Sequence, residues 1–298
     1  MTARKVAFLG GGNMGEALLS GLIRAGRQPG ELMATCRREE RATELTDRYG
    51  VETTLSNPDA CAWADTLVLT VKPQDMERLC EQIAEHVAEE QLVVSVAAGI
   101  RTSFIERRLG AKAPVVRVMS NVPVLVDEAM SVVSAGSVAE DKHLAEAEEL
   151  LGSVGRVIRL PEYHLDAVTA TSGSGPAYFF LLAEAMIDAC ILLGLSRDVA
   201  SELIVQTMVG SAKMLRDTGK HPVELREMVT SPGGTTIAAI VVPPGDVTIS
   251  RSSTGCCPVS RSIFAEPTMV CTMRSVATLR GNPSRMHASI IASARRKK

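Results

Sequence analysis

The sequence predicts a doubly wound parallel α/β sheet in the N-terminal half, followed by an all-α region. Short aliphatic runs alternate with amphipathic stretches as far as residue 160. Such alternation is typical of β-α-β units and of parallel strands. From about 164 to 217 the apolar residues instead follow helical spacing, and no strand pattern returns before 240. The length of 298 residues also favours more than one domain, since single cores stop growing at roughly 250–300 residues.

The individual elements follow from these patterns. Short, mainly apolar runs of four to six residues indicate buried parallel strands, and longer amphipathic stretches indicate helices. Strands are expected at 6–9, 31–35, 66–71, 92–96 and 115–119, and helices at 14–25, 38–49, 75–87, 164–195 and 199–217. The predicted domains are 1–160, 161–240 and an atypical tail, 241–298. The apolar helix 164–195 is expected to pack against another subunit.

Composition narrows the function classes. The formal net charge is −2, with 46% hydrophobic and 22% charged residues, which favours neither nucleic acid nor a membrane surface as a partner. The seven cysteines lack the spacing of a metal site, so we expect reduced thiols, no bound metal and a cytoplasmic protein. The sequence shows no signal peptide pattern and no uncharged apolar run near ~18–20 residues, so no membrane span is expected.

A glycine-rich turn follows the first predicted strand. Residues 10–15 read Gly-Gly-Gly-Asn-Met-Gly and begin a predicted helix. This strand–turn–helix context identifies a Rossmann dinucleotide site. Gly10 permits the tight turn, Gly12 allows a pyrophosphate to approach the backbone, and Gly15 allows close packing of helix on strand. The helix N-terminus offers unpaired N–H groups to the phosphates. The alternative is a glycine turn without a ligand.

The end of the second predicted strand selects the cofactor. A site for NAD usually has a carboxylate there to bind the ribose hydroxyls. Here the chain has Cys36, Arg37 and Arg38 instead, and guanidinium groups match phosphate oxygens. We therefore expect NADP(H), with Arg37 or Arg38 on the 2′-phosphate. The alternative is that both arginines are solvated residues at a helix start. Two later strand ends, 71–73 and 96–98, are expected to complete the cofactor site.

Five motifs in order resemble pyrroline-5-carboxylate reductase over about residues 4–240. They are Gly10–Gly15, Val71-Lys72-Pro73-Gln74, Ser95–Gly99, Asp166–Tyr178 (Asp-Ala-Val-Thr-Ala-Thr-Ser-Gly-Ser-Gly-Pro-Ala-Tyr) and Thr230–Thr236 (Thr-Ser-Pro-Gly-Gly-Thr-Thr). A further segment, Arg117–Pro123, resembles the family's R-x-M-P-N-T-P with Ser120 and Val122 as replacements. The resemblance implies NADPH-dependent reduction of a cyclic imine to L-proline, and a helical domain that intertwines in a homodimer, with rings of dimers as a further assembly.

The resemblance also adds site residues. It places Cys36 and Asn57 among the cofactor contacts and Thr235 and Thr236 on the substrate loop. The resulting cofactor-binding candidates are Gly10, Gly12, Asn13, Met14, Gly15, Cys36, Arg37, Arg38, Asn57, Val71, Lys72, Pro73, Val96, Ala97, Ala98 and Asn121.

The substrate loop also has a physical interpretation. Glycines at a helix start leave N–H groups free for a carboxylate, and a threonine hydroxyl can bond an imine nitrogen. The alternative is a Ser-Pro turn with a threonine cap. The substrate-binding candidates are Ser174, Ser231, Gly233, Gly234, Thr235 and Thr236, of which Thr235 and Thr236 are the catalytic candidates.

The tail departs from the family. Residues 241–298 contain nine basic and two acidic residues, with no helical or strand period. We interpret this switch as translation in another reading frame or as an unstructured segment, and sequencing the encoding DNA tests the first idea. A basic extension that binds an acidic partner is the alternative. Two other functions stay open: another NADP-dependent imine or hydroxyacid reductase, and an NADP-binding protein inactivated by its tail.

Overall fold

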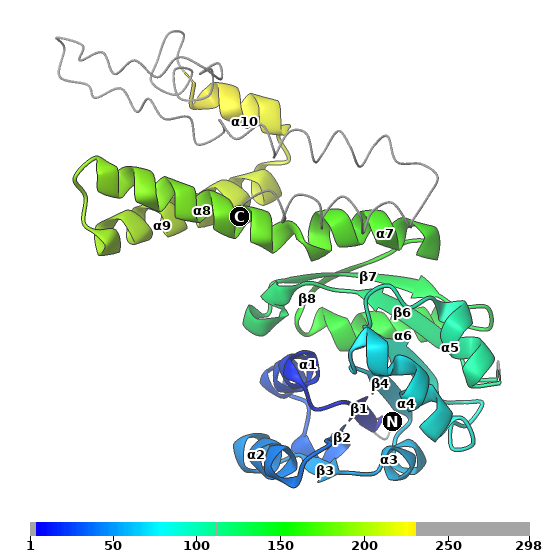
Figure 1. Cartoon of the computed structure of the whole chain (residues 1–298). Coiled ribbons are helices and arrows are strands. Elements are labelled where there is room, and N and C mark those ends of the chain that lie inside the picture. The colour runs from blue at the N-terminus through cyan, green and yellow to red at the C-terminus, as the bar shows by residue number, and fades with distance from the viewer. Residues whose placement is uncertain (1–3, 111, 231–298) are drawn as a thin grey trace, which may run out of the picture. The chain divides into compact units, whose positions relative to one another are not determined.

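A computed structural model describes residues 4–110 and 112–230. The described residues form two compact units, which divide after Phe179, within helix α8. The first unit contains one sheet in the order β3-β2-β1-β4-β5-β6-β7-β8 (Figure 1). Its strands are β1 (Val6–Leu9), β2 (Leu32–Thr35), β3 (Glu52–Thr54), β4 (Thr66–Leu69), β5 (Leu92–Ser95), β6 (Val115–Met119), β7 (Ala129–Ala135) and β8 (Gly155–Arg159).

The strand pairing confirms the predicted fold class. From β3 to β6 every neighbouring pair is parallel. The sheet also contains β3, β7 and β8, which the sequence patterns did not reveal, and β7 is antiparallel to β6. A parallel neighbour needs a crossover of about a dozen residues or more. The short link 120–128 after β6 therefore brings the chain straight back antiparallel.

Helices cover both faces of the sheet. They are α1 (Asn13–Arg24), α2 (Glu39–Tyr49), α3 (Asn57–Trp63), α4 (Met76–Ile83), α5 (Thr102–Arg108) and α6 (Asp141–Gly152). Short 3-10 turns lie at Pro29–Glu31, Pro73–Asp75, Val122–Val126 and Glu162–His164. The helices α3, α5 and α6 were not expected from the sequence. For α3, the residues at its start could have predicted the helix. The Ser56 side chain accepts a hydrogen bond from Asp59 N–H as an N-cap, and Pro58 follows in the first turn.

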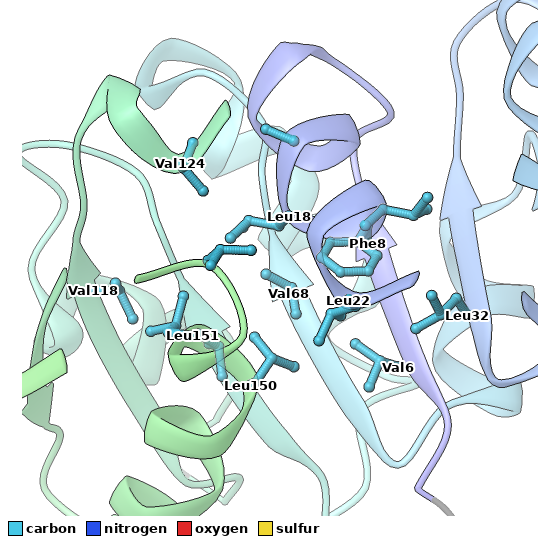
Figure 2. Close-up of a cluster of buried hydrophobic side chains, with 14 of the residues drawn as sticks. Val6, Phe8, Leu18, Leu22, Leu32, Val68, Val118, Val124, Leu150 and Leu151 are labelled. Carbon is cyan, nitrogen blue, oxygen red and sulfur yellow. The ribbon is translucent and has the colours of Figure 1, made fainter. Parts of the chain in front are cut away.

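The core consists of one aliphatic layer on each face. Helices α1, α2 and α6 pack on one face, where Leu18 of α1 and Leu151 of α6 belong to one buried cluster with Phe8 and Val68 (Figure 2). Helices α3, α4 and α5 cover the other face. Burying one such side chain contributes roughly 1.5–3 kcal/mol, so the two layers fix the strand ends that carry the candidate site.

The described cysteines Cys36, Cys61, Cys80 and Cys190 are free thiols. Burial raises the pKa of Cys61 to about 12 and that of Cys80 to about 11. Both are therefore protonated at neutral pH and act as small apolar core residues.

The helical stretch after β8 is interrupted once. It consists of α7 (Leu165–Val168), a π-helical turn (Thr169–Gly173) and α8 (Gly175–Leu192), where the sequence suggested one nearly continuous helix. By length and composition alone, Glu162–Leu192 could also cross a membrane. Its side chains are largely exposed in the single chain. Exposed apolar side chains in this number indicate that another surface packs against this segment.

The second unit continues with α9 (Arg197–Thr218) and α10 (Pro222–Met228). Helix α9 begins where the Ser196 hydroxyl accepts a hydrogen bond from Val199 N–H and ends at Gly219 in the left-handed conformation. The loop Ser231–Thr236 and the tail 241–298 lie outside the described residues, so their interpretations stay predictions. The domain boundaries at 160 and 240 stay predictions as well.

Candidate active site

The glycine turn between β1 and α1 has the geometry that its sequence predicts. Gly10 has φ +121°, in the region that favours glycine. A Cβ on Gly15 would lie 2.3 Å from the Gly10 carbonyl oxygen, so only glycine fits beside the turn. A Cβ on Gly12 would meet nothing within 4 Å. Open space over Gly12 is what the close approach of a pyrophosphate requires.

Two neighbouring strands hold this turn in place. The Gly11 N–H donates to the Thr35 carbonyl oxygen at 2.6 Å, and the Gly10 N–H donates to Thr35 Oγ1 at 3.1 Å. On the other side, the Thr70 hydroxyl donates to the Gly10 carbonyl oxygen at 2.7 Å. The ends of β2 and β4 thus fix the turn. Sequence reasoning missed both threonines, because their role depends on strand order.

The N-terminus of α1 is open to an anion. Gly12 is its N-cap, and no side chain caps the helix. Glu16 in the first turn bonds to the side chains of Arg41, Arg48 and Tyr49. Burial raises the pKa of Glu16, but these hydrogen bonds outweigh it and hold the pKa below its ordinary value. The arginines neutralise this carboxylate, so the helix end keeps its attraction for phosphate.

Arg41 is a second residue that the sequence did not reveal. Its Nε donates to the Gly11 carbonyl oxygen at 2.8 Å, and its guanidinium also pairs with Glu16 and Glu44. Arg41 therefore joins α2 to the glycine turn. Its position three residues after Arg38 and one turn into α2 was the available signal, but its partners could not be inferred without the fold.

The predicted 2′-phosphate arginines lie at the end of β2. Arg38 is the exposed N-cap of α2. Arg37 is also exposed, and its Nη2 lies 2.7 Å from Asp75 Oδ2, at the end of the 3-10 turn after β4. Asp75 is half-buried, but Arg37 is exposed, and ion pairs at the protein surface contribute only about 0–1 kcal/mol. Arg37 can therefore exchange Asp75 for a phosphate at little cost.

The cofactor candidates from the resemblance have different surroundings. Cys36 is buried beneath the turn: a Cβ on Gly11 would lie 2.7 Å from its Sγ. Burial raises the pKa of the Cys36 thiol, so it is a packing group there. Asn57 begins α3, and its amide donates to Gln82 Oε1 of α4 at 2.8 Å. The structure does not bring Asn57 to the glycine turn through any described contact.

The ends of β4 and β5 present small and exposed groups. Val71 packs against Gly10, with its Cγ1 3.1 Å from the place a Cβ would take. Lys72 is exposed and Pro73 begins the following turn. After β5, Ala97 is buried and Ala98 is exposed. Because β1, β4 and β5 are adjacent and parallel, these groups share the carboxyl edge of the sheet with the glycine turn.

Asn121, just past β6, links two segments. Its Oδ1 accepts a hydrogen bond from Met130 N–H at 3.0 Å, and its Nδ2 donates to the Ser172 carbonyl oxygen at 3.2 Å. Ser174, the candidate on the substrate side, is exposed directly after the π turn. Ser231, Gly233, Gly234, Thr235 and Thr236 lie outside the described residues. Within residues 4–110 and 112–230, no group of three His, Cys, Asp or Glu side chains could hold a metal ion.

Comparison with known proteins shows which family the chain is similar to. Residues 162–243 match the family described as pyrroline-5-carboxylate reductase dimerisation, and residues 5–99 match the family of NADP oxidoreductases described as coenzyme F420-dependent. The pyrroline-5-carboxylate reductase of Corynebacterium melassecola is 45% identical over 79% of this chain and 88% of its own. The chain belongs to the pyrroline-5-carboxylate reductase family.

Other relatives of the reductase agree. The pyrroline-5-carboxylate reductase of Pseudomonas aeruginosa is 43% identical over 80% of this chain and 88% of its own. The solved structure of the Coxiella burnetii enzyme, 37% identical, covers 80% of this chain and 88% of its own with a TM-score of 0.74. That of Plasmodium falciparum, solved with NADP bound, is 28% identical with a TM-score of 0.72 and covers 79% and 87%.

These findings confirm the sequence-based predictions of family, enzyme class and cofactor. The reductase is an oxidoreductase with an NADP-binding domain and a helical dimerisation domain. The apolar helix α8 lies within the matched dimerisation segment. A subunit partner therefore accounts for its exposed side chains.

Proposed function

We propose that the reductase converts 1-pyrroline-5-carboxylate to L-proline with NADPH, the last step of proline biosynthesis. The observation that carries this proposal is the 45% identity to a pyrroline-5-carboxylate reductase over 79% of the chain. The intact glycine turn and the arginine pair after β2 support it independently, because they fit a dinucleotide with an extra phosphate.

The proposed cofactor site follows the carboxyl edge of the sheet. The open N-terminus of α1 and the space over Gly12 would hold the pyrophosphate. Arg37 and Arg38 would bind the 2′-phosphate. The small groups after β5, Val96, Ala97 and Ala98, would leave room for the nicotinamide ring. Lys72 and Pro73 would flank the cofactor at the end of β4.

The proposed substrate site needs few reactive groups. The nicotinamide supplies the hydride. The protein has to place the imine carbon beside the ring, exclude water and hold the substrate carboxylate. We assign the carboxylate to the N–H groups of the loop Ser231–Thr236 with Ser174 beside it. Thr235 and Thr236 would orient the imine nitrogen, whose proton would come from Thr236, from water or from substrate protonated in solution.

We further propose a cytoplasmic homodimer that assembles into a ring of dimers and has neither nucleic acid nor a membrane as partner. The dimerisation segment supports the dimer. The formal net charge of −2 supports the absence of a polyanionic partner.

The test is the reaction itself. Purified full-length protein is mixed with NADPH and pyrroline-5-carboxylate, and NADPH absorbance is followed together with proline formation. We expect oxidation of NADPH matched by proline. NADPH binding without oxidation would favour a protein inactivated by its tail. Oxidation with other imines or keto acids, but not with this one, would favour a different reductase. Either result contradicts the proposal.

A further inference from the structure

The π turn Thr169–Gly173 lies where the helical segment passes the end of β6. Its defining bond runs from Ser174 N–H to the Thr169 carbonyl oxygen at 2.9 Å. π turns are uncommon and occur frequently at functional sites. This one directly precedes Ser174 and α8, within the motif Ser-Gly-Ser-Gly-Pro. The position of the π turn therefore sets the position of the Ser174 backbone, on the proposed substrate side.

The sequence leaves one carbonyl of this turn without its usual helical donor. In an α-helix, the Ser172 carbonyl would accept a bond from the N–H of residue 176. Residue 176 is proline, which has no N–H. Asn121 supplies the missing donor: its Nδ2 lies 3.2 Å from the Ser172 carbonyl oxygen.

The Asn121 amide has a fixed orientation. Its Oδ1 accepts from Met130 N–H while its Nδ2 donates to Ser172. A rotated amide would face a donor with a donor and an acceptor with an acceptor. Both ends of this half-buried side chain are thus engaged.

Alternate residues of β6 and of the loop directly after it contact the segment from Glu162 to Gly173. Arg117, which is 3% exposed, bonds to Glu162 at its start, with 3.1 Å between Nη1 and Oε1. Met119 lies against Gly173: a Cβ there would come 2.4 Å from the Met119 Cε. Asn121 then bonds to Ser172. Residues 117, 119 and 121 follow the two-residue repeat of a strand, so their side chains lie on the same side of the chain. The end of β6 therefore determines the position of the π turn.

We propose that Asn121 is a positioning residue for the reaction. Through the Ser172 carbonyl, it holds the π turn at the carboxyl edge of the sheet and so places the Ser172–Gly175 backbone and Ser174 at the imine site. Its contribution to the cofactor site is indirect. The effect on catalysis rests on the proposed function. The pinning, by which we mean that the Asn121–Ser172 hydrogen bond holds the π turn in place, does not depend on any reaction.

The kinetic test compares Asn121→Asp with the wild-type chain. The carboxylate still accepts from Met130 N–H but cannot donate to the Ser172 carbonyl. We expect the KM for pyrroline-5-carboxylate to rise about tenfold, the effect of losing roughly 1.4 kcal/mol, while the Kd for NADPH changes less than about twofold. Asn121→Gln, which keeps the amide donor on a longer side chain, is expected to restore part of the loss.

Ser131→Ala is the matched control. It removes a buried bond between the Ser131 and Ser120 hydroxyls, 2.9 Å long, at the same strand pair but away from the π turn. We expect unchanged KM and NADPH Kd. An unchanged KM in Asn121→Asp, or a KM rise that Ser131→Ala reproduces, would overturn the proposal. An NADPH Kd that weakens in step with KM would instead make Asn121 a direct cofactor ligand and also overturn it.

Hydrogen exchange separates this inference from the proposed function. In Asn121→Asp, we expect the amides of residues 169–178 to exchange faster than in the wild-type protein, with β1–β5 unchanged. This readout needs no turnover. A wild-type chain that fails to reduce the imine contradicts the proposed function alone, whereas unchanged exchange in residues 169–178 contradicts the pinning.

Discussion

Gly12 and Gly15 share one turn but have opposite surroundings. The space over Gly12 is open, whereas a Cβ on Gly15 would lie 2.3 Å from a backbone oxygen. We expect Gly15→Ala to cost about 1–3 kcal/mol of unfolding free energy, because the backbone must shift. Gly12→Ala should leave stability within about 0.5 kcal/mol and still abolish NADPH binding, because the methyl group fills the space for the pyrophosphate.

Urea unfolding and NADPH titration of the two variants measure this contrast. A Gly12→Ala protein that binds NADPH like the wild type would show that the space over Gly12 is not used by the cofactor. A Gly15→Ala protein with unchanged stability would show that the turn relaxes freely.

Arg37 is expected to decide the choice between NADPH and NADH. Arg37→Ala should weaken NADPH binding by about tenfold and NADH binding much less, since a guanidinium–phosphate bond is worth roughly 1.5–3 kcal/mol. Asp75→Asn should strengthen NADPH binding, because the pair with Asp75 competes with the phosphate. Titration of both cofactors checks this. Equal losses for NADPH and NADH in Arg37→Ala would remove Arg37 from the 2′-phosphate site.

Glu162 connects the element after β8 to α5 and β6. Its Oε1 accepts from Thr102 N–H at 2.8 Å and from Arg117, and its Oε2 accepts from the Thr102 hydroxyl at 3.0 Å. Burial raises the pKa of Glu162, but these bonds together hold the pKa below its ordinary value. A lowered folded pKa stabilises the protein above the unfolded pKa, and this stabilisation is lost as pH falls through the folded value.

Glu162→Gln should therefore destabilise the protein by roughly 1–3 kcal/mol at pH 7, and the difference from wild type should shrink in acid. Denaturant unfolding between neutral pH and about pH 3.5 measures it. Glu148→Gln is the control, since its partner Arg159 is exposed and such pairs contribute about 0–1 kcal/mol. A difference for Glu162→Gln that does not vary with pH would contradict the ionic role.

The elements differ in how far the sequence could predict them. Buried parallel strands such as β1 and β4 are short, mainly apolar runs, and the sequence predicted them. Strand β8 has arginines at both 156 and 159 and no fully buried residue, so its pattern carries little hydrophobic signal. The hydrogen bonds of the Thr35, Thr70 and Glu162 side chains join residues far apart in sequence. Their roles follow from strand order, which no local pattern contains.

Helices α8 and α9 leave many apolar side chains exposed in a single chain. Helix α8 is mainly apolar, with Glu184 and Asp188 as its two charged residues, and Phe180 is 64% exposed. On α9, Leu203 and Val209 are 51% and 56% exposed. Exposed apolar side chains in this number indicate a protein interface, and residues 162–243 match a dimerisation family. The helical unit therefore needs its copy to complete an apolar core.

Phe180→Asp should convert the dimer to monomers, because it places a charge in the buried interface. Analytical ultracentrifugation would measure the mass, and titration would measure NADPH binding. We expect NADPH binding to survive, since the glycine turn belongs to the first unit, while reductase activity falls. The control Val138→Asp lies outside the helical segment, at a position that is 42% exposed, and should stay dimeric. A Phe180→Asp protein that remains a fully active dimer would place the subunit interface elsewhere.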